Sequence, residues 1–292
     1  MKALKLAGVF APITTPFDAR GQVDPAAHAD NVARLSAAGL DGFLVAGSTG
    51  EAPLLDPDEY GVLVKATRQT LPAGKTLLVG TGAEATRQAI ALSKIAADAG
   101  ADAVVVRAPA YFGPVSPPES LIAYFRDVAD ASPVPVLVYN MPKFTHVTIT
   151  PAILEQLRDH PNIAGSKDSS GDTNNLAAYR KAAPNWPLLS GSAGILCSAL
   201  ELGCAGGIVA VACFAPAPCV ALVAAFRAGD KTRASALQEQ LKVLDREIVG
   251  KLGPAGVKAA MDAAGFKGGP VRAPLADVSP ADRGRIAQLV AA

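Results

Sequence analysis

Eight short apolar runs recur along the chain, and each is followed by a longer stretch with helical spacing. The runs are continuous rather than alternating, which is typical of parallel strands buried on both faces. We predict strands at Val9–Thr14, Gly42–Ala46, Leu77–Gly80, Ala103–Arg107, Val134–Tyr139, Ile163–Lys167, Leu188–Ser190 and Gly207–Val211. Eight strand–helix units in series favour an α/β fold of the closed (β/α)8 TIM-barrel type over a doubly wound open sheet.

Polar residues directly before a proline mark the expected helix starts. An Asp, Ser or Thr there places a capping oxygen ahead of a proline in the first helical position. Such pairs stand at Asp24-Pro25, Asp56-Pro57, Ser116-Pro117, Thr150-Pro151 and Ser279-Pro280. Glu59 and Glu119 fall three residues after their caps and complete two predicted capping boxes. Helix ends are expected at the glycines that follow Ala/Leu-rich stretches, namely Gly39, Gly100, Gly203 and Gly229.

The chain continues well past the eighth predicted strand. Helical spacing is found in Pro216–Ala228, Lys231–Leu252, Ala255–Ala264 and Pro280–Ala291, which is more than one barrel helix requires. We therefore predict a barrel catalytic domain at residues 1–228 and a C-terminal helical extension at residues 229–292. The extension is expected to pack on the barrel and is a candidate for part of a subunit interface.

Composition narrows the class of protein. Half of the 292 residues are apolar and the mean hydropathy is +0.27, so the chain can bury a sizeable core. A formal charge of +1 without a basic run argues against nucleic acid as the main partner. No apolar stretch reaches the roughly 18 residues that span a bilayer. Residues 1–5 do not open a signal peptide, so a cytoplasmic protein with no membrane partner is expected.

The cysteines and histidines show no ligand spacing. Cys197, Cys204, Cys213 and Cys219 contain no C-x-x-C pair and lie in apolar surroundings, as buried free thiols do in a reducing compartment. The three histidines are scattered along the chain, which makes a metal mechanism an unfavoured reading. The chain also has no glycine-rich phosphate loop, so no nucleotide and no other cofactor is expected.

Lys167 is the candidate that carries most chemistry. It ends the sixth apolar run, and active sites of barrels of this type lie at the carboxyl ends of the strands. A lysine held partly out of water is penalised in its charged form, which makes it a candidate amine nucleophile for a carbonyl substrate. Ser48 and Thr49, between glycines at the end of strand two, offer hydroxyls and N–H groups to a substrate carboxylate. Tyr139, at the end of strand five, is a candidate proton carrier.

Three ordered motifs carry a resemblance to a known family. Gly47-Ser48-Thr49-Gly50-Glu51, Tyr139-Asn140-Met141-Pro142 and Gly165-Ser166-Lys167-Asp168 stand at strands two, five and six. With this spacing the chain resembles, over essentially its whole length, the dihydrodipicolinate synthase / N-acetylneuraminate lyase superfamily. The resemblance implies a Schiff-base class I aldolase that acts on pyruvate-type substrates through a covalent imine and assembles as a homotetramer, a dimer of dimers.

The resemblance also implies a role for each matching residue. Lys167 is the Schiff-base lysine, Tyr139 the phenol that moves protons, and Ser48 the hydroxyl that links this phenol to the next relay member. Thr49 helps to hold the substrate carboxylate. The other residues expected to bind substrate are Gly47, Gly191, Ile208, Tyr111 and Phe112.

The chain departs from the family at three places. Where many members have Tyr-Tyr, with the second tyrosine inserted into a neighbouring subunit's site, this chain has Tyr111-Phe112, so the relay is expected to be shortened. Phe144 occupies the position where dihydrodipicolinate synthases carry a basic residue for the aldehyde substrate, with Lys143 before it. Gly191 is followed by Ser192 rather than by the acidic residues with which neuraminate lyases bind sugar hydroxyls.

Stretches such as Gly165–Asp172 and Ser190–Gly194 resemble the 4-hydroxy-2-oxoglutarate aldolase branch. We therefore predict a carbon–carbon lyase that acts on pyruvate or a short 2-keto-4-hydroxy acid. One alternative is a 4-hydroxy-tetrahydrodipicolinate synthase that condenses pyruvate with aspartate semialdehyde. A second is a non-catalytic keto-acid-binding barrel, which only Phe112 supports.

Overall fold

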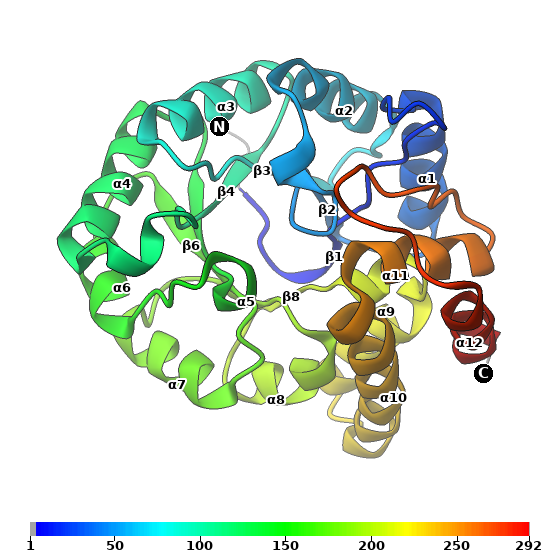
Figure 1. Cartoon of the computed structure of the whole chain (residues 1–292). Helices are drawn as coiled ribbons and strands as arrows, with labels where there is room; N and C mark the ends of the chain where they lie inside the picture. Colours follow the sequence, from blue (N-terminus) through cyan, green and yellow to red (C-terminus); the bar gives the residue numbers. More distant parts are fainter. Residues whose placement is uncertain (1–3, 292) are drawn as a thin grey trace.

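The computed structural model describes residues 4–291, and in it eight parallel strands close into a barrel in chain order (Figure 1). Each strand pairs with the next, and β8 pairs with β1 to complete the closure. The strands are β1 Gly8–Ala11, β2 Gly42–Val45, β3 Thr76–Gly80, β4 Ala103–Arg107, β5 Val136–Asn140, β6 Ile163–Asp168, β7 Leu188–Ser190 and β8 Gly206–Ile208. The predicted (β/α)8 barrel is confirmed.

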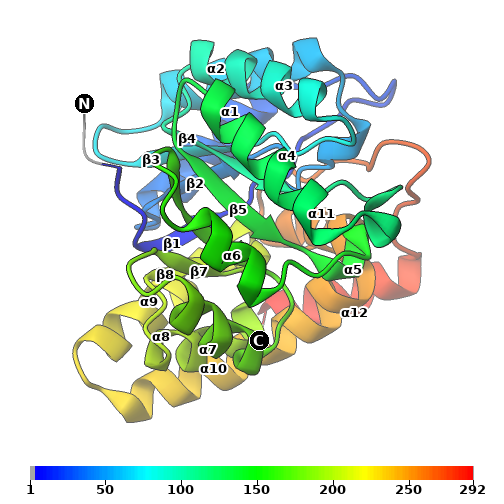
Figure 2. The ribbon, with the colours of Figure 1, turned by 90° about the vertical axis from the view of Figure 1, so that its left-hand side faces the viewer.

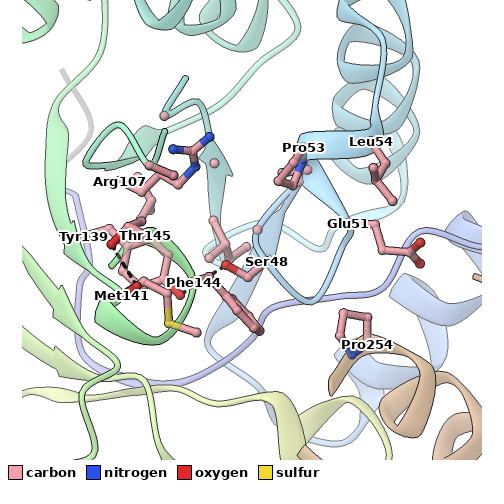
Figure 3. A pocket seen from close by; sticks show the side chains of 18 of the residues that line it. Ser48, Glu51, Pro53, Leu54, Arg107, Tyr139, Met141, Phe144, Thr145 and Pro254 are labelled. Atoms are coloured by element: carbon pink, nitrogen blue, oxygen red, sulfur yellow. Dashed lines mark hydrogen bonds between the residues drawn. The ribbon is translucent and has the colours of Figure 1, made fainter. Parts of the chain in front are cut away.

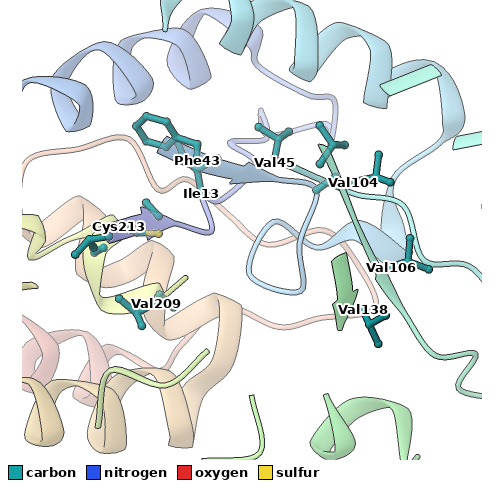
Figure 4. Close-up of a cluster of buried hydrophobic side chains, with 14 of the residues drawn as sticks. Ile13, Phe43, Val45, Val104, Val106, Val138, Val209 and Cys213 are labelled. Atoms are coloured by element: carbon teal, nitrogen blue, oxygen red, sulfur yellow. The ribbon is translucent and has the colours of Figure 1, made fainter. Parts of the chain in front are cut away.

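Alternation along the strands separates two apolar cores. In β4, Val104 and Val106 belong to the core between strands and helices, whereas Val105 belongs to the core inside the barrel. Figure 4 shows the outer core at the strand faces, with Phe43, Val45 and Val138 among the side chains drawn. The inner core consists mainly of Phe10, Leu44, Leu78, Leu137, Leu189 and Ile208. Since both faces are apolar, the strands read as continuous apolar runs.

Helices surround the barrel (Figure 1). They are α1 Pro25–Ala37, α2 Pro57–Thr70, α3 Thr86–Asp98, α4 Pro118–Ala131, α5 Pro142–Thr145, α6 Pro151–Leu157, α7 Thr173–Ala182, α8 Leu196–Glu201, α9 Pro216–Arg227, α10 Lys231–Leu244, α11 Lys251–Ala263 and α12 Pro280–Ala291. Short 3-10 turns are η1 Ala52–Leu54, η2 Gly113–Val115, η3 Ala193–Ile195 and η4 Ala210–Cys213, and η5 Asp245–Gly250 is π-helical. None of the helices within residues 4–291 is long and apolar enough to cross a bilayer.

Most predicted helix starts are found, and one is wrong. The Asp24 side chain accepts a hydrogen bond from the Ala27 amide, and Asp56 and Glu59 form the expected capping box. Helix α4, by contrast, begins at Pro118 with Pro117 as its N-cap, so Ser116 is not the cap and Glu119 completes no box. Pro117 and Pro118 are consecutive, and the sequence alone did not distinguish which of them begins the helix. The Ser116 hydroxyl instead donates to the Phe112 carbonyl oxygen in the preceding turn.

The predicted helix Lys231–Leu252 is divided. It consists of α10, the π-helical segment η5 and the first residues of α11. Helix α11 is itself kinked, because Gly253 has a positive φ of 59° and Pro254 follows it. The kink lets residues 251–263 turn towards the barrel, and Figure 2 shows α5 and α11 at the end towards which β5 points. This is the end where the chain places its candidate chemistry.

Strands β1 and β8 are shorter than predicted. The apolar run at Val9–Thr14 leaves the sheet after Ala11, and the run at Gly207–Val211 leaves it after Ile208 to enter η4. Helix α10 packs on α9 and α12 packs on α11, so the C-terminal helices form a layer continuous with the barrel's last helix. The division at residue 228 stays a prediction.

Candidate active site

Lys167 lies near the end of β6 and is almost entirely buried, with 3% of its surface exposed. Register pairs it directly with Tyr139 on β5. Its Nζ lies 4.2 Å from the centre of the Tyr139 ring, within the range of a cation–π contact. The lysine lines a cavity of about 210 Å³ at the carboxyl end of the barrel. The sequence prediction of a lysine partly removed from water at the barrel mouth therefore agrees with its position.

The Tyr139 hydroxyl is surrounded by hydroxyl groups. Ser48 Oγ lies 3.5 Å from it, and Ser169 Oγ donates to it at 3.4 Å. Burial acts to raise the pKa of Tyr139, but the Lys167 charge, and then hydrogen bonds from Ser169, Ser48 and Lys167, outweigh burial. The pKa of Tyr139 is consequently held below its usual value of 10.0. A phenol tuned in this way gives up its proton more readily than a free one, and its phenolate is better stabilised.

Ser169 was missed by sequence reasoning. It follows the Lys167-Asp168 pair directly, and the pairing of β6 with β5 brings its hydroxyl to Tyr139. Its neighbour Asp168 accepts hydrogen bonds from Asn140 Nδ2 at 2.7 Å and from Ser170 Oγ at 2.6 Å. Asp168 is buried, and it ties the end of β6 to the end of β5. We read it as a residue that fixes the two strand ends beside the lysine.

Ser48 and Thr49 lie on the turn between β2 and η1, and both line the 210 Å³ cavity. Two further predicted residues, Gly191 and Ile208, line it as well. The structure thus brings together six of the nine predicted site residues: Lys167, Tyr139, Ser48, Thr49, Gly191 and Ile208.

The other three predicted residues lie elsewhere. Gly47 lines a neighbouring cavity of about 400 Å³, which shares Ser48 and Tyr139 with the first (Figure 3). Tyr111 and Phe112 line neither cavity of their own chain. They stack edge to face with ring centres 4.8 Å apart and are 79% and 70% exposed. Tyr111 and Phe112 are therefore separate from the cavities that the other predicted residues line.

The larger cavity has a mainly apolar wall with one ion pair. Arg107 Nη2 lies 2.9 Å from Glu84 Oε1, and Glu84 also accepts hydrogen bonds from the amides of Ala110 and Tyr111. Burial opposes ionisation of Glu84, but these amides and Arg107 hold its pKa below the usual value. Arg107 is therefore committed to fixing the β4 loop.

One wall of the 210 Å³ cavity comes largely from the C-terminal helices. Asp245 of η5 accepts hydrogen bonds on Oδ2 from Ser192 Oγ at 2.7 Å and from the Gly194 amide at 2.9 Å. Burial raises the pKa of Asp245 against the opposing effect of these bonds. Lys143, after β5, donates from Nζ to the Gly250 carbonyl at 2.7 Å. This wall carries one carboxyl and one ammonium group, and sequence reasoning did not place Asp245 in it.

Within residues 4–291 no group of three or more His, Cys, Asp or Glu side chains is arranged to hold a metal ion. The polar groups that line the 210 Å³ cavity are instead two lysine side chains, a phenol, hydroxyls and one carboxyl group. These groups are suited to covalent carbonyl chemistry with proton transfer.

Comparison with known proteins agrees with this geometry. The family model described as the dihydrodipicolinate synthetase family matches residues 5–292. The chain is 38% identical over 274 residues to a 4-hydroxy-tetrahydrodipicolinate synthase of Synechococcus sp. (strain CC9605), covering 93% of this chain and 90% of that protein. It is also 38% identical over 282 residues to an uncharacterised DapA-like lyase of Halobacterium salinarum, covering 96% and 91%.

Solved structures give the same result. A prophage protein of the dihydrodipicolinic acid synthase family from E. coli K12, in complex with pyruvate, superposes with a TM-score of 0.92 at 29% identity, covering 98% of this chain and 97% of that one. The dihydrodipicolinate synthase DapA-2 of Bacillus anthracis superposes with a TM-score of 0.94 at 27% identity, covering 99% of both chains. The predicted superfamily is confirmed: the chain belongs to the dihydrodipicolinate synthetase family and is a carbon–carbon lyase of the class I aldolase type.

Proposed function

We propose that this lyase forms an imine between Lys167 and a 2-keto acid, either pyruvate or a short 2-keto-4-hydroxy acid that it cleaves. The observation that carries the proposal is the buried Lys167 amine, 4.2 Å from the Tyr139 ring, in a cavity that Ser48 and Thr49 also line. No added cofactor takes part in the proposed reaction, because the protonated imine itself withdraws electrons from the bond that breaks.

In the proposed mechanism, Tyr139 carries the protons of both imine formation and bond cleavage. The neutral Lys167 amine attacks the keto carbon, and a proton passes from the nitrogen to the former carbonyl oxygen. Tyr139 then gives its proton to the resulting hydroxyl, which leaves as water and leaves a protonated imine. The resulting phenolate then removes the proton of the substrate's C4 hydroxyl. The C3–C4 bond breaks, an aldehyde leaves, and the electron pair moves to the iminium nitrogen as an enamine. Tyr139 gives the proton it has taken to C3, and water adds to the iminium carbon. The phenolate regains a proton from the added water's hydroxyl as the carbon–nitrogen bond breaks, which releases pyruvate and the free lysine.

The surroundings of Tyr139 support this double role. Hydroxyl donors at 3.4 Å and 3.5 Å, from Ser169 and Ser48, stabilise the phenolate between its two transfers. The Ser48–Thr49 turn, which lines the same cavity as the lysine, offers hydroxyls to the substrate's C1 carboxylate. We therefore assign Ser48 to the proton relay, and Thr49, with Gly47, Gly191 and Ile208, to substrate binding.

The second half of the substrate meets Lys143, Phe144, Ser192 and Asp245. Phe144 gives an apolar surface where a synthase of aspartate semialdehyde carries a basic side chain, which favours cleavage of a 4-hydroxy-2-oxoglutarate-like acid. Lys143 is the cation available for its distal carboxylate. The alternative, a 4-hydroxy-tetrahydrodipicolinate synthase, is supported by the relative of that activity from Synechococcus sp. (strain CC9605), which is 38% identical to this chain.

Two assays separate the candidates. Cleavage of 4-hydroxy-2-oxoglutarate is followed through pyruvate release coupled to lactate dehydrogenase. Condensation of pyruvate with aspartate semialdehyde is followed directly at equal enzyme concentration. We expect the first kcat/KM to exceed the second by at least tenfold. The opposite ratio would establish the synthase, and neither activity with an intact lysine adduct would establish the non-catalytic binding barrel.

We also propose a homotetramer, a dimer of dimers. Tyr111, Phe112 and Val115 are 79%, 70% and 79% exposed and lie within five residues of each other after β4. Such a group of exposed apolar side chains is typical of an interaction surface. Light scattering at micromolar concentration should give four chains per particle, and Phe112→Asp should reduce that number. A wild-type monomer would contradict the assembly.

The proposed compartment is the cytoplasm. Cys197, Cys204, Cys213 and Cys219 are all free thiols, and three of them are buried. Disulfides are rare in reducing compartments, so this usage supports the proposal. Alkylation of the denatured protein, purified without reductant, should modify all four thiols.

A further inference from the structure

The turn that carries Ser48 and Thr49 is bracketed by two strained residues. Ala46 and Glu51 have positive φ values of 51° and 59°, a conformation that non-glycine residues seldom adopt. Such a conformation is energetically unfavourable and persists only where its surroundings enforce it. The turn is also closely packed, since a Cβ at Gly50 would lie 2.9 Å from the Ile13 carbonyl oxygen. Some part of the molecule therefore has to hold residues 46–51 in place.

The C-terminal segment supplies that hold. Lys258 of α11 places its Nζ 2.5 Å from Glu51 Oε1, and the two side chains are 1% and 0% exposed. The amide of Arg272 donates to the other Glu51 oxygen at 2.8 Å. Lys258 Nζ also donates to the Pro270 carbonyl at 2.6 Å. Both carboxylate oxygens of the turn's last residue are thus held by residues more than 200 positions later.

Arg272 extends this contact to the next helix. Its guanidinium binds Glu59 with two bonds of 2.6 Å and donates to the Leu54 carbonyl at 2.7 Å. Both Arg272 and Lys258 lie against the Phe17 ring, at 4.2 Å and 4.3 Å from its centre. The residues after the turn are therefore fixed from two directions by one C-terminal segment.

Backbone hydrogen bonds within the turn connect Glu51 directly to Ser48. The Glu51 amide donates to the Ser48 carbonyl at 3.1 Å, and the Ala52 amide donates to the Gly47 carbonyl at 3.2 Å. Ser48 Oγ is only just within hydrogen-bond distance of Tyr139, at 3.5 Å. A small displacement of Glu51 would consequently break the Ser48–Tyr139 contact and move Thr49.

Stability alone does not account for a buried ion pair. Desolvation of two charges offsets most of their attraction, and apolar replacements of such pairs are often neutral or stabilising. What an ion pair supplies in addition is a defined geometry. Here it ends on a strained residue that lies two positions from Thr49 and three from Ser48.

We propose that Glu51, Lys258 and Arg272 are positioning residues, which hold the Ser48–Thr49 turn in the geometry that binds the keto-acid carboxylate and completes the contact to Tyr139. The proposal rests on the proposed function, because it takes Ser48 and Thr49 as groups that contact the substrate.

The test compares Glu51→Gln, Lys258→Met and the double variant with wild type. Each is measured for Tm, for KM and kcat of cleavage, and for the pyruvate concentration that half-saturates borohydride trapping at Lys167. We expect both single variants to lose about ten- to a hundredfold in kcat/KM, mostly through KM, since misplacement by ~1 Å can cost a factor of about 100. The double variant, which has no buried charge at this place, should recover much of the lost Tm. Its KM should stay close to the raised KM of the single variants.

The matched control is Arg68→Met. Arg68 pairs with Asp102 at 3.3 Å, and Asp102 precedes β4 at the opposite, amino-terminal end of the barrel. This variant should lower Tm with KM unchanged. If the Glu51 and Lys258 variants behave like this control, their role is structural and the proposal is overturned.

The experiment distinguishes failure of the proposed function from failure of the positioning role. If Lys258→Met does not fold, Glu51→Gln, which keeps the side chain's size, carries the test by the same criterion. If wild type itself forms no adduct at Lys167, the proposed function fails. If wild type forms the adduct and the folded variants half-saturate at the same pyruvate concentration, only the positioning role fails.

Discussion

Removing the Tyr139 hydroxyl tests the proposed proton carrier with little change to the fold. Tyr139→Phe keeps the ring that lies 4.2 Å from Lys167 Nζ and the apolar contacts inside the barrel. The hydroxyl's two neighbours, at 3.4 Å and 3.5 Å, are at the long end of hydrogen-bond distances. The loss of stability should therefore be within about 1 kcal/mol.

The loss of activity should be much larger. A positioned acid–base group contributes about 10²–10⁴-fold to a rate, which corresponds to about 3–5 kcal/mol of activation free energy. We expect kcat for cleavage to fall by that factor, while borohydride still traps a slowly formed adduct at Lys167. The assay is coupled pyruvate release in steady state, with single-turnover trapping for the imine step. A variant within tenfold of wild type in kcat would refute the assignment of Tyr139.

The pH profile gives an independent check. The phenol's proton is present below its pKa, which burial alone would raise but which Lys167, Ser169 and Ser48 hold below 10.0. Activity that uses this proton should decline as pH rises through that value, and so at a pH below 10.0. Ser169→Ala removes one stabilising bond and should move the decline to higher pH. A profile in Tyr139→Phe that keeps the wild-type alkaline limb would assign the limb to another group.

Three more predictions concern other parts of the chain. Phe112→Tyr should raise kcat if the relay between subunits is shortened at this residue, and an unchanged or lower kcat in a folded tetramer would count against that reading. Asp245→Asn removes a carboxylate, which accepts a hydrogen bond from Ser192 at 2.7 Å and would repel a second carboxylate on the substrate. KM for a substrate with a distal carboxylate should therefore fall about threefold to tenfold at constant kcat. Equal KM values would show that the distal carboxylate lies elsewhere. Glu59 has a lowered pKa, chiefly because Arg272 binds it, so its stabilisation is complete above its usual value of 4.5 and is lost as pH falls through the folded value. Arg272→Met should lower the free energy of unfolding by about 2–4 kcal/mol near neutral pH, with less of that difference left at pH 3 by urea titration; an equal difference at both pH values would contradict the ion pair's contribution.

Sequence patterns predicted the strands where burial on both faces was uninterrupted. Strands β4 and β7 have the predicted bounds, because their apolar runs are closed on both sides by polar or turn residues. The runs at β1 and β8 continue into buried turns, so hydrophobicity alone could not mark where pairing stops. Likewise, residues 231–252 have one helical spacing throughout, and nothing in it distinguishes the π-helical turn of η5.

The site residues that lie at or just after strand ends could be predicted from the sequence, whereas those that come from the C-terminal helices could not. Lys167 and Tyr139 lie near the ends of two strands and Ser48 lies on the turn after a third, so the parallel barrel sufficed to bring them together. Asp245 reaches the cavity from a helix that follows the barrel, and its partner is Ser192, 53 residues away. The Glu51–Lys258 pair joins residues 207 positions apart in the same way. Such contacts depend on how the C-terminal helices pack, which no short pattern specifies.

The central claim is that Lys167 forms an imine with a 2-keto acid. The direct measurement is incubation with pyruvate, reduction with borohydride, and peptide mapping by mass spectrometry, with Lys167→Met and omission of pyruvate as controls. The account predicts one reduced pyruvyl adduct per chain, on Lys167 and absent from both controls. An unmodified Lys167, or an adduct at another lysine with cleavage activity retained in Lys167→Met, would contradict it.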